Sequence, residues 1–359
     1  MSELSSTERT RLRRHADRTA TDRAELLAIL DEAPIVQVAI ATARGPLVLP
    51  MAHGRIGEHL YLHGARGNGL LRSIAAGAEV CASATLLDGL VVARSAMHHS
   101  MNYRSATIFS TGQEVEDQDE KRAALGAVVS HVLAGRGEET RPPSPSELAA
   151  TLVVRLSLAE ASVKIRRGPP LDAEDDRALP HYAGVVPLTV RAGEPIPDGH
   201  VALPPSVERA ILAGAPHGGR GRAGSVELDG DPLRHDLGRV LGWLRDESTW
   251  ARGRTRGQMV RALAGSIAVG AYEGGAQIGF ARAVTDRTTF AWLADVFVDR
   301  GHRGRGVASA MVGHLVSLPE LTGLRRWLLA TRDAHPLYAR HGFVPGDPAR
   351  LMERLVEPA

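Results

Sequence analysis

Ala291-Trp-Leu-Ala-Asp-Val-Phe-Val298 runs directly into Asp299-Arg-Gly-His-Arg-Gly-Arg-Gly-Val-Ala308, and this junction decides the fold of the second half of the chain. The first stretch is an apolar strand, and the second is a turn with Gly304 and Gly306 that opens a predicted helix over 307–316. The first amides of a helix have no partner within it, so they can point at an anion. Glycine permits the unusual dihedrals and the close approach that a pyrophosphate needs. The junction therefore predicts a phosphate-binding turn, and its spacing fits neither a nicotinamide nor an ATP motif.

The turn contains Arg303-Gly-Arg-Gly306-Val-Ala308, and a short strand and a helix that carries Tyr338 follow over 326–343. These motifs resemble the acyl-CoA signature of the GNAT acetyltransferases, and the similarity extends over about 237–354. The order of helices and strands in this region is that of an α/β domain with a mixed sheet. The resemblance implies transfer of an acetyl group from acetyl-CoA to a small-molecule or protein amine, with Tyr338 as the acid that protonates the departing thiolate.

The resemblance also implies which residues hold acetyl-CoA. We expect main-chain amides of the turn to bind the pyrophosphate and strand residues to pair with the pantetheine arm. The expected contacts are Val296, Phe297, Val298, Arg303, Gly304, Arg305, Gly306, Val307, Ala308 and Thr331. The candidates for a general base are Asp286 and Asp295, which both lie near the cofactor strand. The alternative is that Asp295 is a satisfied structural carboxylate and that proximity and a water relay carry the reaction.

Short apolar stretches separated by turn residues fill the first half of the chain, a pattern typical of a barrel or a sandwich. Helices are expected over 22–31 and 119–133. The expected strands cover 35–41, 45–51, 59–63, 79–86, 90–93, 106–109, 112–115, 151–156 and 162–165.

Two polar clusters interrupt these stretches. His63-Gly-Ala-Arg-Gly-Asn68 follows one strand, and Asn102-Tyr-Arg-Ser105 precedes another. The second cluster places an aromatic ring, a guanidinium and a hydroxyl close together, which suits a planar ligand that bears phosphate. His98 and His99 are adjacent, and neighbours on an extended segment point to opposite sides, so we expect no metal site.

Several motifs between about 8 and 190 resemble the pyridoxamine-phosphate-oxidase-like flavoproteins, in particular the branch related to nitroimidazole-resistance reductases. They are Ile29-Leu-Asp-Glu-Ala33, Leu60-Tyr-Leu-His-Gly64, Leu87-Asp-Gly-Leu-Val-Val-Ala-Arg-Ser95, Ser100-Met-Asn-Tyr-Arg-Ser105, Lys164-Ile-Arg-Arg-Gly-Pro-Pro170 and Ala183-Gly-Val-Val-Pro-Leu188. The resemblance implies an FMN-binding split β-barrel of the α+β class that forms a homodimer with flavin at the subunit interface.

By the same resemblance, the residues expected to bind FMN are His63, Gly64, Asn68, Tyr103, Arg104, Ser105 and Lys164. The chain departs from the family at Gly69, where a cation usually holds the flavin phosphate, and at Tyr182, where the family usually has tryptophan. The loss of the cation removes a charge-assisted hydrogen bond worth about tenfold to a hundredfold in affinity. The alternative is a barrel that only dimerises or senses a ligand, with acetyl transfer as the only activity.

The composition narrows the classes of function. Forty-three basic and 41 acidic side chains give a formal charge of +2, so there is no general case for nucleic-acid or membrane binding. Cys81 is the only cysteine, which excludes an internal disulfide framework and a Cys-based zinc site. Nucleic-acid binding through the arginine-rich N-terminus would need stacking aromatics that the sequence lacks. The sequence has neither a signal peptide nor a membrane-length apolar run, so we expect a cytoplasmic protein.

We therefore predict four segments. Residues 1–22 form a basic arm that lies on a partner subunit or frays into solvent, and 23–200 form the flavin-binding split barrel. Glycine and proline accumulate over 201–224, which predicts a linker, and 225–359 form the acetyltransferase domain. The predicted protein is bifunctional, with an oxidoreductase-like flavin domain and an N-acetyltransferase.

Overall fold

The structure, a computed structural model, describes residues 3–11, 16–199 and 202–354. The chain divides into two compact units, Met1–Val190 and Arg191–Ala359, and each is described by itself. Parts of the predicted basic arm, residues 1–2 and 12–15, lie outside the described residues, as do the last five residues of the chain.

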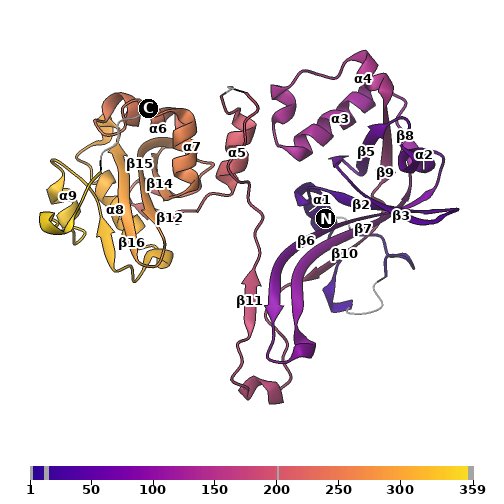
Figure 1. Ribbon diagram of the computed structural model, residues 1–359, viewed down its shortest axis with the longest axis horizontal. Helices are drawn as coiled ribbons and strands as arrows, with labels where there is room; N and C mark the ends of the chain where they lie inside the picture. Colours follow the sequence, from indigo (N-terminus) through magenta and orange to yellow (C-terminus); the bar gives the residue numbers. More distant parts are fainter. Residues whose placement is uncertain (1–2, 12–15, 200–201, 355–359) are drawn as a thin grey trace. The chain divides into compact units, whose positions relative to one another are not determined.

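The first unit contains two antiparallel sheets (Figure 1). The larger has the strand order β1-β10-β7-β6-β2-β3, with β11 paired to β6, and the smaller has the order β4-β5-β9-β8. The strands are β1 (Thr19–Ala20), β2 (Val36–Thr42), β3 (Gly45–Met51), β4 (His53–Ile56), β5 (His59–Ala65), β6 (Glu79–Val92), β7 (Ser100–Thr111), β8 (Gln113–Glu114), β9 (Thr151–Ser157), β10 (Glu160–Arg166) and β11 (Gly184–Pro187). The helices are α1 (Arg23–Glu32), α2 (Gly69–Ala75), α3 (Gln118–Val132) and α4 (Pro145–Ala150), with short 3-10 turns η1 (Ala16–Arg18), η2 (Ala96–His98), η3 (Arg136–Glu139) and η4 (Asp175–Ala178).

One apolar core fills the space between the two sheets. Alternate residues of β2, Val36, Val38 and Ile40, point inward, and α1 adds Leu26 and Ile29. The period-two burial of the strands and the period of α1 match the predicted pattern. The predicted barrel-like domain is therefore confirmed at the level of its elements.

Two strands are longer than predicted. β6 covers both of the separate strands expected over 79–86 and 90–93, with an irregular pairing to β7 between Leu87 and Gly89. A Cβ at Gly89 would lie 3.0 Å from the side chain of Val185, so glycine allows β11 to pack closely there. β7 begins at Ser100, so the polar cluster over 102–105 lies inside a strand and not before one.

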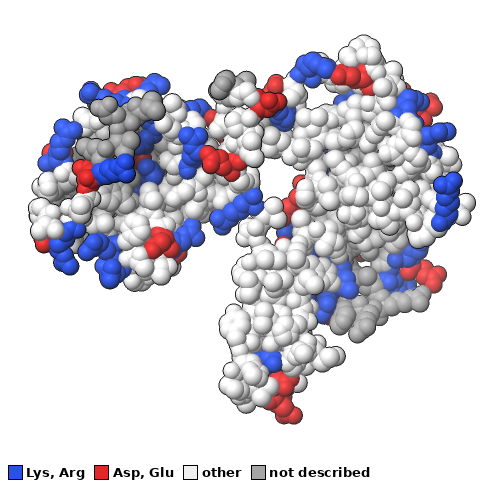
Figure 2. Space-filling model, in the orientation of Figure 1, with Lys and Arg blue, Asp and Glu red and all other residues white. Residues whose placement is uncertain are grey.

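The hairpin of β6 and β7 extends beyond the barrel, with β11 along its edge (Figure 1). We call this extension the β-arm. Its exposed apolar side chains are Leu87, Leu90, Met97, Met101, Tyr182 and Val186, and it is almost uncharged over the face shown in Figure 2, apart from its tip. Exposed apolar surface of this kind is typical of a contact with another molecule.

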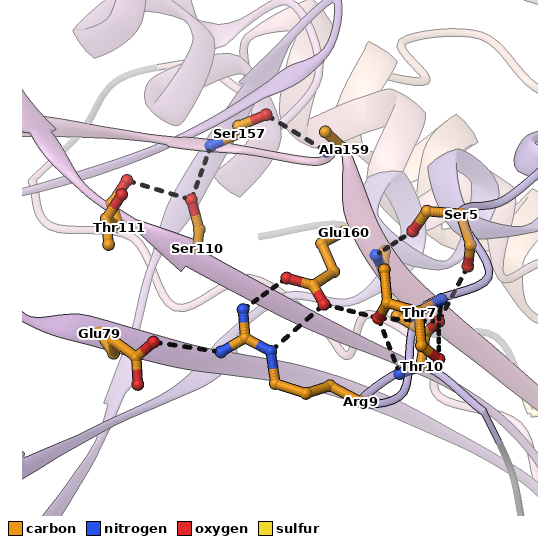
Figure 3. Close-up of polar contacts among 11 residues, drawn as sticks. Ser5, Thr7, Arg9, Thr10, Glu79, Ser110, Thr111, Ser157, Ala159 and Glu160 are labelled. Carbon is orange, nitrogen blue, oxygen red and sulfur yellow. Dashed lines mark hydrogen bonds and ion pairs between the residues drawn. The ribbon is translucent and has the colours of Figure 1, made fainter.

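The described part of the N-terminal arm lies on the barrel of its own chain (Figure 3). Arg9 forms ion pairs with Glu160 at 2.5 Å and with Glu79 at 3.3 Å, and the hydroxyl of Thr7 donates to Glu160 at 2.6 Å. β1 then pairs with β10 through Thr19. We expected this arm on a partner subunit or in solvent; its described residues instead close the edge of the larger sheet.

The second unit contains one mixed sheet of strand order β12-β13-β14-β15-β16-β17, in which only the β16–β17 pair is parallel. The strands are β12 (Arg220–Ala223), β13 (Val226–Asp229), β14 (Ile267–Glu273), β15 (Ala276–Thr285), β16 (Phe290–Val298) and β17 (Arg326–Leu328). The helices are α5 (Pro205–Ala213), α6 (Leu237–Gly242), α7 (Arg256–Ala264), α8 (Val307–Val316) and α9 (His335–Ala339), with a single π-helical turn η5 (Trp243–Glu247) and 3-10 turns η6 (Arg300–His302), η7 (Pro319–Leu321) and η8 (Pro348–Arg350).

Helices cover both faces of this sheet. α8 packs on one face through Met311 and Leu315, and α5, α6 and α7 pack on the other against Phe280 and Phe297. Trp243 of η5 stacks on Phe297 with ring centroids 5.6 Å apart. The predicted α/β domain with a mixed sheet is confirmed, and α8 has the predicted bounds.

The predicted linker over 201–224 is structured where it is described. α5 joins the core of the second unit through Ile211 and Leu212, and Glu208 binds Arg256 of α7 at 2.7 Å. β12 lies at the edge of the sheet and pairs with β13. Backbone hydrogen bonds between the two segments continue past these strands, where Gly218 and Gly230 approach closely. High glycine content here reflects this close packing of two backbones, not a flexible connection.

Candidate functional site

The glycine turn before α8 has the geometry of an anion site. Gly304 and Gly306 have φ angles of +74° and +81°, a region that glycine adopts at little cost. Gly306 is the N-cap of α8, so the amides of the first helical turn have no partner within the helix. Nε of Arg303 donates to the carbonyl of Val298 at 3.0 Å and ties the turn to the end of β16. The turn is thus organised to receive a phosphate.

The sheet opens beside this turn. β16 and β17 are paired only as far as Trp292 and Leu328, and beyond this point the same edge of β16 has no strand partner among the residues that the structure describes. Asp295 has a φ of +52°, and the register between β15 and β16 shifts at this position, so a β-bulge lies here. The free edge of β16 offers main-chain N–H and C=O groups to an extended ligand.

A cavity of about 1130 Å³ joins the glycine turn to the free edge of β16. Nine of the ten residues predicted to contact acetyl-CoA line it, namely Val296, Phe297, Val298, Arg303, Gly304, Gly306, Val307, Ala308 and Thr331. Arg305 is the exception, since its side chain forms an ion pair with Glu273 at 2.6 Å. The residues of the glycine turn and of the end of β16 therefore lie together along one cavity.

Asp295 lines the cavity but is fully engaged. Its Oδ2 accepts hydrogen bonds from Arg254 and Arg282 at 2.6 Å each, and its Oδ1 accepts one from the indole of Trp250 at 3.2 Å. Burial alone would raise the pKa of Asp295, but the two guanidiniums outweigh burial and hold it below its ordinary value. The geometry favours the structural alternative for this carboxylate over a general base.

Asp286 lies outside the cavity lining, in the exposed turn between β15 and β16. It accepts hydrogen bonds from the hydroxyl and amide of Thr289 and from the amides of Thr288 and Phe290. These bonds, the hydroxyl of Thr289 first, lower the pKa of Asp286. We correct its assignment as a candidate base, because its carboxylate organises the turn instead.

Tyr338 of α9, the predicted acid, is buried and lines the cavity. Burial raises the pKa of its phenol, and the charge of Asp333 adds to this effect. The described residues give the Tyr338 hydroxyl no hydrogen-bond partner and give Asp333 no ion pair. Asp333 also lines the cavity, so it is an available carboxylate that the sequence motifs did not reveal.

Four of the other lining residues are not among those that the sequence motifs predict to bind acetyl-CoA or to act as acid or base. Trp250 and Arg254 come from the loop after η5, Arg282 from β15 and Trp292 from the start of β16. These positions are as much as 42 residues from one another along the chain, and no local motif links them. Only the pairing of β15 with β16 and the packing of η5 bring them together.

In the first unit, two of the predicted flavin residues stabilise the fold. Asn68 caps α2 by accepting from the amide of Leu71 at 3.1 Å, and a Cβ at Gly64 would lie 2.9 Å from the Leu71 side chain. Burial lowers the pKa of His63, and its Nδ1 is buried without a hydrogen-bond partner. His63 is therefore the member of this cluster that keeps an unused polar atom.

The second predicted cluster is divided between two faces of β7. Successive residues of a strand point to opposite faces, so Tyr103 and Ser105 share one face and Arg104 takes the other. Arg104 binds Asp88 at 2.8 Å and Glu32 at 2.5 Å, and hydrogen bonds to these carboxylates raise its pKa. We therefore correct the expectation that Arg104 stands beside Tyr103 to bind a phosphate.

Three cations lie beside Tyr103 and Ser105: the predicted Lys164, together with Arg18 and Arg166, which are not among the residues predicted to bind FMN. Tyr103 pairs with Arg166 and Ser105 with Lys164 across β7 and β10. Arg18 directly precedes Thr19, which pairs with Lys164 across β1 and β10. Among the described residues, none of these three cations forms an ion pair with a carboxylate.

The guanidinium of Arg166 is buried and donates to the carbonyl groups of Gly168 at 3.2 Å and Pro169 at 3.1 Å and to the side-chain oxygen Oδ1 of Asn102. Burial, followed by the charge of Arg18, lowers its pKa. A buried cation without a counter-charge is costly, and an anionic ligand would remove that cost. We call Arg18, Lys164 and Arg166 the cation cluster.

Among the described residues, no hydrogen bond or ion pair joins His63 to the cation cluster. Within 3–11, 16–199 and 202–354, no group of three or more His, Cys, Asp or Glu side chains is placed to hold a metal ion. Over the same residues, none of the helices has the length and apolar character needed to cross a membrane.

Comparisons with known proteins agree with this division. Residues 22–165 match the family described as pyridoxamine 5'-phosphate oxidase, and residues 237–343 match the GNAT acetyltransferase family. No curated protein matches the chain.

Three solved structures are similar to parts of the chain. The flavocytochrome Anf3 from Azotobacter vinelandii is 34% identical, with 57% of this chain and 97% of that chain covered and a TM-score of 0.54. The FAD and heme binding protein from Mycobacterium smegmatis is 40% identical, with 54% and 97% covered and a TM-score of 0.52. A protein of the GNAT family from Xanthomonas campestris pv. campestris is 42% identical, with 36% and 93% covered and a TM-score of 0.36.

The chain covers nearly the whole length of the first two relatives, and the two family matches lie in different units of the chain. The chain therefore joins a domain of the pyridoxamine 5'-phosphate oxidase family to a domain of the GNAT acetyltransferase family.

Proposed function

We propose that the second unit transfers an acetyl group from acetyl-CoA to a primary amine. The observation that carries this proposal is the continuity of the glycine turn with the free edge of β16 in one cavity. The amides after Gly306 would bind the pyrophosphate, and the edge beyond Trp292 would pair with the pantetheine arm as an added strand does. The thioester would then lie near Val296 and Tyr338.

In the proposed reaction, the nitrogen of a neutral amine attacks the thioester carbon. The C–S bond breaks, the nitrogen loses a proton as it becomes an amide, and the CoA sulfur gains one. Tyr338 stays protonated because burial raises its pKa, so it can give its proton to the sulfur and recover one from the nitrogen. Asp333 would attract the ammonium form of the amine, take one proton from it and pass that proton to water. Asp295 would hold Arg254 and Arg282 in place.

Isothermal titration calorimetry with acetyl-CoA tests this proposal most directly. We expect one acetyl-CoA to bind per chain and CoA to compete for the same place. Release of free thiol in the presence of a panel of amines then reports transfer. A protein that stays folded and yields no heat with acetyl-CoA would remove the proposal.

For the first unit we propose flavin binding, with the phosphate group near the cation cluster and the ring system against Tyr103. One support is the positive charge of Arg18, Lys164 and Arg166, which no described carboxylate compensates. The other is that one relative is named a flavocytochrome and another an FAD and heme binding protein. Because Gly69 removes a usual phosphate contact, Arg166 would supply the cation in its place. When bound, the flavin would supply hydride or electron transfer, and the chain would bind and orient it.

The sequence resemblance favoured FMN, whereas the names of the two relatives point to FAD. Titration of flavin-free protein with FMN and with FAD separates these choices through quenching of flavin fluorescence. A protein that binds neither would leave the alternative, a barrel that only dimerises or senses another ligand.

Heme is a second candidate ligand, because both relatives are named as heme or cytochrome proteins. The β-arm has the properties that a heme needs, with exposed Met97 and Met101 and with His98 and His99 at its tip. Addition of hemin to the purified protein tests this idea. A sharp Soret band that His98→Ala or His99→Ala abolishes would support it.

We also propose that the protein is a homodimer through its first unit, with the exposed apolar side chains of the β-arm in the interface. Light scattering during gel filtration measures the mass. Replacement of Met101 and Val186 by lysine should shift a dimer toward monomer.

A further inference from the structure

The cavity of the second unit has an end that acetyl-CoA does not need. Away from the glycine turn, its lining comes from the loop between η5 and α7, from β15, from the start of β16 and from the segment after β17. We call this region the acceptor end; its residues are Trp250, Arg254, Arg282, Trp292 and Arg332.

Two guanidiniums at the acceptor end each form only one hydrogen bond to the described residues. Arg254 through Nη1 and Arg282 through Nε both donate to a single oxygen, Oδ2 of Asp295, at 2.6 Å each. No described residue accepts from the other nitrogens of either guanidinium, and both side chains line the cavity. The unused N–H groups therefore form a donor set suited to a planar carboxylate.

The charges at the acceptor end do not cancel. Arg254 and Arg282 share one buried carboxylate, which leaves one positive charge in excess. Arg332 adds another cation, held by the hydroxyl of Thr249 at 3.2 Å, and the carboxylate of the adjacent Asp333 offsets it, so the excess is one positive charge. The nearby Glu247 does not compensate, because Arg300 binds it at 2.7 Å. An acceptor that brings its own negative charge would meet a matched surface here.

Two tryptophans flank these cations. Trp250 is 56% exposed and Trp292 is 39% exposed, although both line the cavity. The hydrogen bond from Trp250 to Asp295 fixes the edge of the indole while its faces remain accessible. Exposed indole faces next to a carboxylate-binding group suit an acceptor with a flat aromatic group.

We infer that the acetyl acceptor is a primary amine that carries both a carboxylate and an aromatic ring, as an aromatic α-amino acid does. The inference rests on the proposed acetyl transfer. The carboxylate binds Arg254 and Arg282, and the ring lies against Trp250 or Trp292. The amine is then directed toward Val296 and Tyr338, where Asp333 attracts its ammonium form.

The test compares matched acceptors with the full-length protein and acetyl-CoA, with thiol release as the readout. The acceptors are phenylalanine and tryptophan, their amides, the decarboxylated amines 2-phenylethylamine and tryptamine, and leucine. We expect kcat/KM for the two acids to exceed that for their amides by about tenfold to a hundredfold, since the carboxylate contributes charge-assisted hydrogen bonds. Leucine should be a poorer acceptor than phenylalanine because it lacks the ring.

Arg254→Gln should abolish most of the preference for acid over amide, and the exposed Arg332→Gln gives a second, milder test if Arg254→Gln does not fold. Arg245→Gln is the matched control, because Arg245 pairs with Asp246 outside the cavity lining. It should leave the preference unchanged.

Equal kcat/KM for acids and amides would overturn the inference. A second result would also overturn it: calorimetry shows that acetyl-CoA binds, but phenylalanine and tryptophan give neither turnover nor a change in the tryptophan fluorescence of the protein. Failure of acetyl-CoA itself to bind is a separate result, which removes the proposed function and this inference with it.

Discussion

Trp292 and Leu328 form the last paired position between β16 and β17. Past this pair, no described strand pairs with the edge of β16, and here the glycine turn and Tyr338 line the same cavity. A parallel strand pair that stops early thus creates the space for an extended ligand beside β16. The predictions below test the parts of this arrangement and of the first unit separately.

Gly306→Glu should abolish acetyl-CoA binding. The new side chain would place a negative charge where the pyrophosphate is expected, and it would force a non-glycine residue to φ +81° at a cost of about 1–2 kcal/mol. Calorimetry with acetyl-CoA measures the effect. Gly275→Glu is the control, because Gly275 has a φ of +83°, has free space around it and lies outside the cavity lining. If both variants bind acetyl-CoA equally, the turn does not hold the diphosphate.

Tyr338→Phe should lower kcat by about a hundredfold and change the Kd of acetyl-CoA by less than twofold, since general acid catalysis contributes on the order of 10²–10⁴. Tyr272→Phe serves as the control, because Tyr272 is a buried tyrosine of the same unit that bonds His235 away from the cavity. Unchanged turnover in Tyr338→Phe would remove this tyrosine from the mechanism.

The protonation of Tyr338 also predicts how kcat/KM of the wild-type enzyme depends on pH. Burial raises the pKa of Tyr338 above its ordinary value of 10, so the phenol remains protonated at neutral and mildly basic pH. We expect kcat/KM to rise with pH as the acceptor loses its ammonium proton, and to fall only above pH 10. A fall that begins near pH 8 would show that another group supplies the proton.

Asp286→Ala should leave kcat within twofold of the wild type, because Asp286 caps a turn outside the cavity lining. The variant should instead lower the midpoint of thermal unfolding of the second unit. All four tryptophans lie in this unit, at 243, 250, 292 and 327, so tryptophan fluorescence follows its unfolding alone. A large loss of turnover without a loss of stability would restore Asp286 as the base.

Arg166→Gln should weaken flavin binding by about tenfold or more, because it removes a buried cation that has no carboxylate partner in the described structure. Arg167→Gln is the adjacent control, since its exposed side chain pairs with Glu25 at 3.7 Å. Fluorescence titration with FMN and FAD measures both. A folded Arg166→Gln that binds flavin as tightly as the wild type would place the phosphate elsewhere.

His235 should make the second unit less stable in mild acid. Burial lowers its pKa from 6.5 to about 4, so between these values the unfolded chain binds more protons than the folded one. Stability therefore falls as pH drops from 6.5 toward 4, by up to about 1.4 kcal/mol per pH unit. Urea unfolding followed by tryptophan fluorescence at pH 7, 6 and 5 measures this slope. His235→Gln should reduce it, whereas His335→Gln at an exposed position should not.

The sequence predicted those parts of the molecule that depend on local patterns. The strand that ends at Val298, the glycines at 304 and 306 and the helix over 307–316 are consecutive, and the structure has them with the expected bounds. The cluster around Asp295 could not be predicted in this way. Its partners Arg254 and Arg282 come from a loop and from another strand, and only the fold brings them together.

The wrong prediction for Arg104 in the first unit has a physical cause: side chains alternate between the two faces of a strand. Once Asn102 to Ser105 are assigned to a strand, Arg104 must point away from Tyr103 and Ser105. The strand predicted over 106–109 began too late, because polar residues occupy the start of β7 and because Gly89 interrupts the neighbouring β6. Arg166 gave no signal, since an arginine in an arginine-rich chain looks ordinary until its burial is known.

The placement of α5 and β12 has a practical consequence for recombinant expression of the two halves. A fragment that starts at 225 would lose the helix that buries Ile211 and Leu212 and the outermost strand of the sheet. It would also uncover the edge of β13, a template for aggregation. Anyone who wishes to crystallise the acetyltransferase half alone should divide the chain between Val190 and Pro205, ahead of α5.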